Sequence, residues 1–321
     1  MTPESFLNLL STIIVLVLLM ITGFICRKLN VIDGIASKKL SSLIISIGLP
    51  MMVVAALIAK PFTWELAKEG FTFLLLGFLL HPLMALLALP FSRFYKDLDV
   101  KKINLFATTF TNCGFIGFPI LEAIFPGKGA FNGAFFMMGF HVYVWTLGIW
   151  ILSRGRNDIK LTPKKALINL GTVPCVIAFV LYFLKALIPI PTFLIDYTSQ
   201  ISNLCLPISV LVTGALVATQ TPRAMLTNAK LYLFNFVKLI FVPLAVCVIV
   251  KLVTLGMENS YIYILFATVI SALPSAATIT MLGELHDINP AYAAQTVGST
   301  SIISVATLPL MCFIADFIAR L

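Results

Sequence analysis

The sequence predicts an all-α membrane protein in which ten transmembrane helices form two inverted five-helix repeats, with crossed broken helices in the fourth and ninth spans. Three observations lead to this fold class. Of the 321 residues, 60% are hydrophobic and only 11% are charged, whereas soluble domains carry about 25% charged residues. Ten apolar segments follow one another with short polar breaks, and two pairs of motifs recur in the two halves of the chain.

Each apolar segment is long enough to cross a bilayer, because a hydrocarbon core about 30 Å thick needs about 20 residues of helix. The first segment has no basic region before it and no small-residue cleavage site after it, so we expect a retained span rather than a signal peptide. The expected spans cover residues 6–26, 38–59, 69–93, 103–125, 129–152, 165–189, 193–219, 228–254, 260–283 and 290–320.

Basic residues indicate the orientation in the membrane. With the N-terminus outside, the inside loops hold fifteen of the 22 Lys and Arg residues and the opposite side holds six. Because Lys and Arg gather in cytoplasmic loops, we expect both termini on the extracytoplasmic side. The same rule accounts for the net charge of +9 without a nucleic-acid partner. The six cysteines have no metal-binding spacing, so no zinc site is expected.

Two motifs recur at an offset of about 160 residues. GLPMMVVAALIA in the second span is similar to CLPISVLVTGALVA in the seventh, and ATTFTNCG in the fourth is similar to ATVISALP in the ninth. The chain is therefore expected to divide into repeats at 1–153 and 165–321, joined by a cytoplasmic linker at 154–164. Since five is an odd number, the repeats must face opposite ways, as in many secondary transporters.

Helix-breaking residues lie in the middle of spans four and nine: Asn112, Gly114, Gly117 and Pro119 in the first, and Pro274 in the second. Irregular backbone survives in a membrane only where protein or a wet cavity surrounds it. If both helices unwind where they cross, two helix N-termini point partial positive charge at one site, which favours a carboxylate. The alternative is a simple kink, which a single proline often causes; matching breaks in both halves favour the site.

Further motifs carry a resemblance to a known family. NCGFIGFPI from Asn112, ALP ending at Pro274 and HDINPAYAAQTVGSTSIISVATLPL from His286, together with the ten-span repeat, resemble the auxin efflux carrier family. That family includes the plant PIN proteins and bacterial permeases for malate or malonate. The linker at 154–164 is far shorter than the central loop of plant members, so the chain is most similar to the bacterial branch, and the inner membrane is the expected location.

The resemblance implies a fold like that of bile-acid symporters and sodium/proton antiporters. Spans 1, 2, 6 and 7 would form a scaffold, and spans 3–5 and 8–10 a transport domain that moves like an elevator. The resemblance also implies that Asn112 contacts the substrate carboxylate. By the same match, His141, one helical turn before Trp145 and Thr146, helps to bind the substrate.

Other polar residues inside the membrane are candidates because their burial is costly. Lys238 is expected to neutralise an anionic substrate or to take the place of a coupling cation; the alternative is a lysine that reaches lipid headgroups. His81, before Pro82, is expected to be a neutral histidine bonded to a backbone carbonyl, with proton sensing as the alternative. Ser275 and Gln295 are candidate ligands near the crossing, although most membrane Ser and Thr serve helix packing.

The expected function is secondary active transport of small mono- or dicarboxylates, with no cofactor and coupling to H⁺ or Na⁺ left open. The rival classes are a cation/proton antiporter, which needs acids at the crossing, and an enzyme, which needs a catalytic constellation that the sequence lacks. The partners expected are the organic anion, the lipid bilayer and, as an open alternative, a second copy in a homodimer. The expected substrate site comprises Asn112, Gly114, Pro119, His141, Pro274, Ser275 and Lys238.

Overall fold

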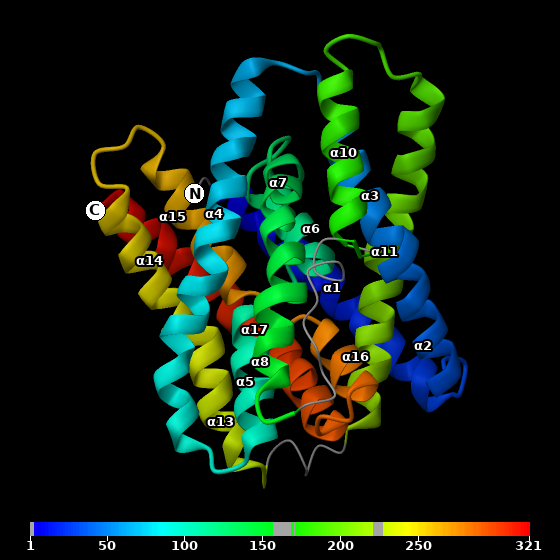
Figure 1. Cartoon of the computed structure of the whole chain (residues 1–321), viewed down its shortest axis with the longest axis vertical. Coiled ribbons are helices and arrows are strands. Elements are labelled where there is room, and N and C mark those ends of the chain that lie inside the picture. Colours follow the sequence, from blue (N-terminus) through cyan, green and yellow to red (C-terminus); the bar gives the residue numbers. More distant parts are fainter. Residues whose placement is uncertain (1–2, 157–167, 170, 221–226) are drawn as a thin grey trace.

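The computed structural model describes residues 3–156, 168–169, 171–220 and 227–321, and all regular secondary structure in these ranges is helical (Figure 1). Seven of the described helices are long and apolar enough to cross a membrane. Shorter apolar helices cover Cys113–Ile124, Thr172–Leu184 and Ser260–Ala272. The structure therefore supports a multi-pass membrane protein.

The N-terminal half contains α1 (Pro3–Lys28), then α2 (Gly34–Leu43), η1 (Ile44–Gly48) and α3 (Leu49–Ile58), then α4 (Trp64–Ala88) and η2 (Leu89–Phe94), then α5 (Leu98–Thr109), η3 (Cys113–Gly117) and α6 (Phe118–Ile124), and finally α7 (Gly129–Tyr143), η4 (Val144–Gly148) and α8 (Ile149–Ser153). The elements η1, η3 and η4 are single π-helical turns, and η2 is a 3₁₀ segment.

The C-terminal half contains α10 (Thr172–Leu184), α11 (Thr192–Thr219), α13 (Ala229–Phe236), the π-helical turn η5 (Val237–Phe241), α14 (Val242–Val253), α15 (Ser260–Ala272), α16 (Thr278–Leu285) and α17 (Pro290–Arg320). Helix is present in each of the ten expected spans. However, the expected spans 103–125 and 260–283 are not continuous helices. The start of the expected span 165–189 and most of the expected linker lie outside the described residues.

Side-chain caps decide where several helices begin. Asp33, Thr63, Asp97 and Asn289 each accept a backbone N–H from the first turn of α2, α4, α5 and α17, respectively. Such caps satisfy N–H groups that have no acceptor within the helix and contribute about 1 kcal/mol each. The sequence therefore sets these boundaries locally.

Three of the π-helical turns stand directly before a proline in the first turn of the next helix. The turns η1, η3 and η5 precede Pro50, Pro119 and Pro243, respectively. Proline lacks an N–H and its ring clashes with the carbonyl four residues earlier. A wider turn relieves that clash, so these spans stay helical through their prolines.

The helices pack as two groups. In one, α1 lies along α11, and α3 packs against α10 and α11; in the other, α4 lies along α7, while α14, α15 and α17 pack together. Glycines allow the closest approach within the first group. A Cβ added at Gly23 would lie 2.0 Å from the Leu211 carbonyl oxygen, and one at Gly214 would lie 1.9 Å from the Met20 carbonyl oxygen. Helices α1 and α11 therefore touch through their backbones.

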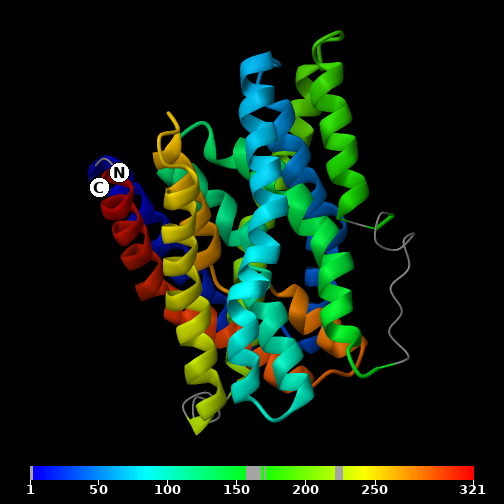
Figure 2. The same cartoon turned by 60° about the vertical axis from the view of Figure 1, so that its left-hand side comes forward.

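Both termini lie in the upper half of the bundle in Figures 1 and 2. The turn between α4 and α5 lies at the opposite, lower end of the bundle in both views. Arg93 at the end of η2 and Lys96 in the turn lie at this end. This basic end of the bundle is therefore separated from both termini.

Gly214→Val should destabilise the protein, because its side chain would overlap the Met20 backbone and force α1 from α11. Overpacking of this kind costs about 1–3 kcal/mol or more. The measurement is the thermal unfolding midpoint of the purified protein in detergent. Gly34→Ala is the matched control, since a Cβ there meets only the Arg27 side chain, at 3.8 Å. Equal midpoints for the two variants would contradict the backbone contact between α1 and α11.

Candidate functional site

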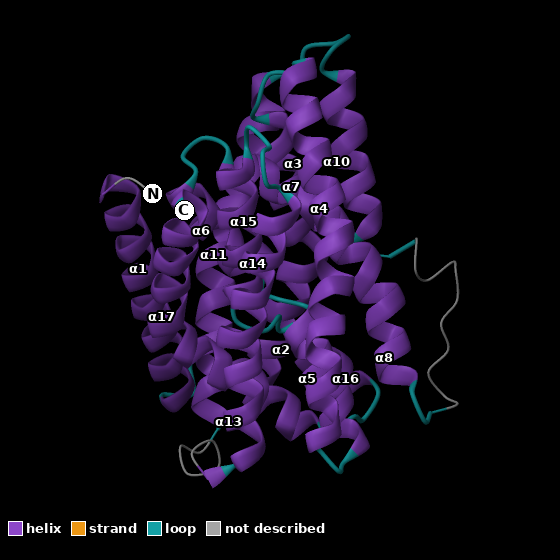
Figure 3. Ribbon diagram, turned by 90° about the vertical axis from the view of Figure 1, so that its left-hand side faces the viewer, coloured by secondary structure: helices purple, strands orange, loops and turns teal. Residues whose placement is uncertain are grey.

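The two interrupted helices meet in the middle of the bundle, where Figure 3 shows loop segments far from either end of the molecule. Helix α5 ends before one break and α15 before the other, and the two breaks run antiparallel through a single bridge between Thr111 and Ser275. The half-helices η3–α6 and α16 begin on the far sides of the bridge. Two helix N-termini and two helix C-termini are thus brought to one place.

Two backbone hydrogen bonds join the breaks. The Asn112 N–H donates to the Pro274 carbonyl at 2.8 Å, and the Ala276 N–H donates to the Phe110 carbonyl at 3.0 Å. Each break therefore supplies partners for polar backbone groups of the other. This pairing removes a cost of several kcal/mol per unsatisfied group inside a membrane.

The two breaks have different local causes. Leu273 has an extended ψ of 152° and precedes Pro274, as expected because proline disfavours helical geometry in the residue before it. In the other break the helix ends at Phe110, and Asn112 then starts the next half-helix. Pro119 does not cause this break. It lies in the first turn of α6, where its missing N–H is tolerated.

Ser275 supports the crossing with two further hydrogen bonds. Its Oγ donates to the Ala107 carbonyl at 2.9 Å, and its N–H donates to Thr300 Oγ1 at 3.1 Å. Ser275 is fully buried. Its hydroxyl thus links the α15–α16 break to α5, and Thr300 links the same break to α17.

Asn112 caps the half-helix that begins at η3. Its Oδ1 accepts the Phe115 N–H at 3.3 Å, which leaves its Nδ2 group as the donor on the opposite side of the amide. The side chain is only 5% exposed. Donors of this kind, together with the partial positive charge of a helix N-terminus, suit a carboxylate.

Gly114 and His141 lie where the two helix groups meet. A Cβ added at Gly114 would lie 2.7 Å from Leu49 Cδ1 in α3 and 3.5 Å from Met137 Cε in α7. His141 follows Met137 by one helical turn, and a Cβ at Gly171, just before α10, would lie 2.1 Å from His141 Nδ1. His141 therefore lies on the face of α7 that meets α3 and α10, and Gly114, in η3, packs against the same face at Met137.

Lys238 occupies a different position from the one expected of a residue that contacts substrate directly. It is 0% exposed, and its Nζ donates to the Ser271 carbonyl in the last turn of α15 at 2.7 Å. The amine thus lies at the partial negative end of a half-helix, where a cation is favourable. It does not reach toward lipid headgroups, so the snorkelling alternative is wrong.

Two other polar candidates lie in separate surroundings. His81 is fully buried among aromatic rings, and its Nδ1 lies 2.6 Å from the Gly77 carbonyl oxygen, which confirms the expected hydrogen bond to a backbone carbonyl. The prediction that Gln295 serves the crossing is wrong. Its Oε1 accepts from Asn228 Nδ2 at 3.0 Å, at the start of α13. The sequence predicts that span ten passes near span nine and offers Thr300 among several hydroxyl residues there; the structure identifies Thr300 as the contact.

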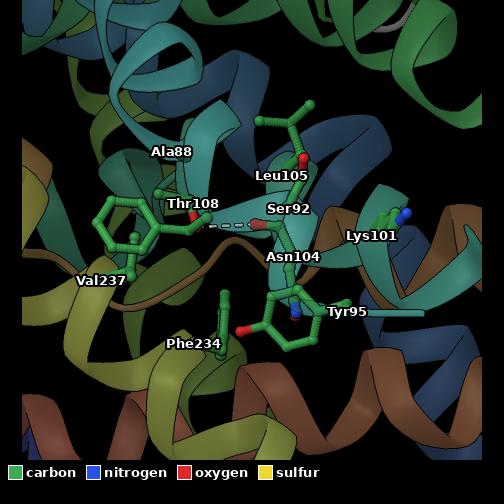
Figure 4. A pocket seen from close by; sticks show the side chains of 10 residues that line it. Ala88, Ser92, Tyr95, Lys101, Asn104, Leu105, Thr108, Phe234 and Val237 are labelled. Carbon is green, nitrogen blue, oxygen red and sulfur yellow. Dashed lines mark hydrogen bonds between the residues drawn. The ribbon is translucent and has the colours of Figure 1, made fainter. Parts of the chain in front are cut away.

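Cavities near the crossing are small. One, of about 10 Å³, lies between η2, α5 and α13 (Figure 4), and its lining includes Tyr95, Asn104, Thr108 and Val237. Another, of about 40 Å³, lies between α1, α11 and α17 beside η3. The first holds about one water molecule. With Asn112 and Ser275 both buried, this conformation is closed over the crossing.

Comparison with known proteins agrees with this architecture. Residues 9–312 match the family model described as membrane transport protein, which represents the auxin efflux carrier family. The chain belongs to this family. No curated protein matches the chain in a direct sequence comparison. Membership makes the protein a membrane transporter.

Ser275→Ala should destabilise the transporter, because the Ala107 carbonyl loses its buried donor while no new partner replaces it. Leaving a buried acceptor unsatisfied costs about 1–3 kcal/mol. The thermal unfolding midpoint of the purified transporter measures the effect. In the control, Thr307→Ala, the lost hydroxyl is exposed and bonds only to Ile303 of its own helix. If both variants melt like the wild type, the Ser275 hydroxyl does not hold the crossing.

Proposed function

We propose that the protein is a secondary active transporter of small organic anions, mono- or dicarboxylates such as malate or malonate, and that the carboxylate binds where the two broken helices cross. The supporting observation is the antiparallel pairing of the breaks at Thr111 and Ser275. This pairing brings the N-termini of η3 and α16 together. Both ends favour negative charge.

Asn112 is the proposed contact for the carboxylate. Its Oδ1 is used by the Phe115 N–H, so the amide presents its Nδ2 donor to a ligand. Gly114 and His141 belong to the same proposed site, because the face of α7 that carries His141 also meets Gly114 through Met137. As a neutral imidazole, His141 has one N–H to donate to an anion. Pro119, Pro274 and Ser275 are proposed to shape the site rather than to bind the ligand.

Elevator-type alternating access is the proposed mechanism. Helices α1, α2–α3, α10 and α11 are the proposed scaffold, and α4–α8 with α13–α17 the proposed transport domain. The tight backbone contacts support this division, since they fall within groups: Gly23 and Gly214 join α1 to α11, and Gly77 and Gly139 join α4 to α7. Movement of one group past the other would carry the crossing, and its anion, between the two sides.

The finer topology is part of the same proposal. Two inverted repeats at 1–153 and 165–321 would be related by an axis in the membrane plane, consistent with helix breaks in the fourth segment of each. The basic turn between α4 and α5 would face the cytoplasm of a bacterium, with both termini outside. The proposed relation to the bacterial branch rests on the short linker.

A cation/proton antiporter is the alternative function for this fold. Such a transporter needs carboxylates at the crossing to bind its cation. Among the described residues, no Asp or Glu belongs to the buried set, and no group of His, Cys, Asp and Glu is arranged to hold a metal ion. The polar groups that meet at the crossing are instead hydrogen-bond donors and small hydroxyls. This composition supports an anion as the transported solute.

Asn112→Asp should weaken malate and malonate binding at least tenfold, a change of about 1.4 kcal/mol. The aspartate still accepts the Phe115 N–H, but it replaces the Nδ2 donor with negative charge. Thermal-shift titration and counterflow in proteoliposomes measure binding and transport. Asn259→Asp, which adds the same charge at the exposed start of α15, is the control. Wild-type transport by Asn112→Asp would exclude Asn112 from the site.

A further inference from the structure

We infer that Lys238 binds a proton together with the organic anion, so that it couples transport to the proton gradient. This inference rests on the proposed function, because it assigns the coupling ion and its residue to the same crossing. Lys238 lies on η5, a π-helical turn in the middle of the eighth span. Among the Lys, Arg, His, Asp and Glu residues that the structure describes, Lys238 has the largest fully buried side chain.

The hydrogen bonding of Lys238 is compatible with an uncharged amine. Its Nζ donates to the Ser271 carbonyl at 2.7 Å. A neutral amine makes this bond with one of its two N–H groups. An ammonium ion has three N–H groups and a full charge, and a buried charge is costly unless a partner compensates for it. The C-terminal end of α15 offers a charged amine a partial negative charge but no ionised partner, so the charged form is only partly compensated.

No acidic counter-charge faces Lys238 from the described elements around it. Helices α5, α13, α14, α15 and α17 pack against η5. The Cys113 thiol at the start of η3 interacts electrostatically with Lys238.

The remaining charged groups of these helices have other partners or lie at their far ends. Lys102 pairs with Asp99 at the start of α5, Lys251 donates to the Ile318 carbonyl, and Asp316 binds Arg320 at the end of α17. Of the other groups, Lys230 and Tyr232 lie near the start of α13, Tyr261 and Tyr263 lie in the first turn of α15, and Tyr292 donates to Asn104. His81 on α4 is held by the Gly77 carbonyl.

An anion at the crossing would be the missing counter-charge. Lys238 binds the C-terminal end of α15 at Ser271, three residues before Pro274, and the Pro274 carbonyl accepts the Asn112 N–H. A carboxylate bound at Asn112 therefore favours protonation of Lys238, and by linkage a protonated Lys238 favours the carboxylate to the same degree. A monocarboxylate and a proton then cross together without net charge. This removes the opposition of the membrane potential to anion uptake, about 2.3 kcal/mol per charge per 100 mV.

The cavity in Figure 4 reaches Val237, the residue before Lys238 in the chain, although Lys238 itself does not line it. Its lining runs from Lys101, near the basic end of the bundle, to Val237, the neighbour of Lys238 in the chain. Asn104 also lines it, and its buried Nδ2 has no hydrogen-bond partner among the described residues. A buried amide of this kind is commonly satisfied by water.

The test is proton uptake on malate binding, measured by isothermal titration calorimetry in two buffers of different ionisation enthalpy, at a pH where malate is fully ionised. The wild-type protein should take up about one proton per malate, and its affinity should fall about tenfold per unit rise in pH. Lys238→Gln keeps a donor for the Ser271 carbonyl but cannot be protonated, so it should bind malate without proton uptake. Lys238→Arg, which is permanently charged, should do the same.

Lys251→Gln is the matched control, because Lys251 also donates to a helix carbonyl, that of Ile318, but away from the crossing; it should keep wild-type proton uptake. Malate binding to the wild type without proton uptake overturns the inference and leaves the carboxylate site standing, whatever the variants do. Unchanged uptake in monodisperse Lys238→Gln also overturns it. Failure of the wild type to bind any carboxylate removes the proposed function and this inference with it.

Discussion

The requirement that every polar backbone group inside a membrane find a partner controls this structure. Two helices stop in mid-bundle, and the groups they release are paired mainly with one another, through Asn112 with Pro274 and Ala276 with Phe110. Neither break would be tolerated alone, since each unsatisfied group costs several kcal/mol in hydrocarbon. The pairing fixes the relative position of α5, α15 and their half-helices, and with it the place where helix ends of both signs meet.

Lysine side chains meet the same requirement at helix C-termini. Lys185 donates to the Ile58 and Lys60 carbonyls at the end of α3, Lys251 to the Ile318 carbonyl in α17, and Lys238 to Ser271 in α15. The first two serve helix ends near the surfaces of the bundle. Lys238 serves one in the middle. All three lysines donate to carbonyls at helix ends, but only Lys238 does so in the middle of the membrane. Water cannot stabilise the charge of its ammonium group there, whereas a bound anion can.

Part of the candidate site follows from sequence. The breaks near Asn112 and Pro274 were predictable, because helix-disrupting residues in matching apolar spans have few other uses. Pro119 was counted among the helix-breaking residues, but it does not break the helix, since proline in a first helical turn costs no hydrogen bond. Gln295 was placed wrongly, because its position within span ten does not say which helix it faces. Thr300 was one of several hydroxyl residues in that span, and only packing distinguishes it by its contact with Ser275.

By itself, the sequence determined that the chain is helical and membrane-spanning, where its apolar segments lie and at which two of them the helix is interrupted. These properties depend on local hydrophobicity, length and backbone preference, which neighbouring residues largely decide. Only the tertiary structure decided that the two breaks pair as an antiparallel bridge, that α1 and α11 touch through Gly23 and Gly214, and that Lys238 faces Ser271 rather than lipid. Those contacts join residues far apart in the chain, and in an apolar span the sequence pattern does not specify which face meets which partner.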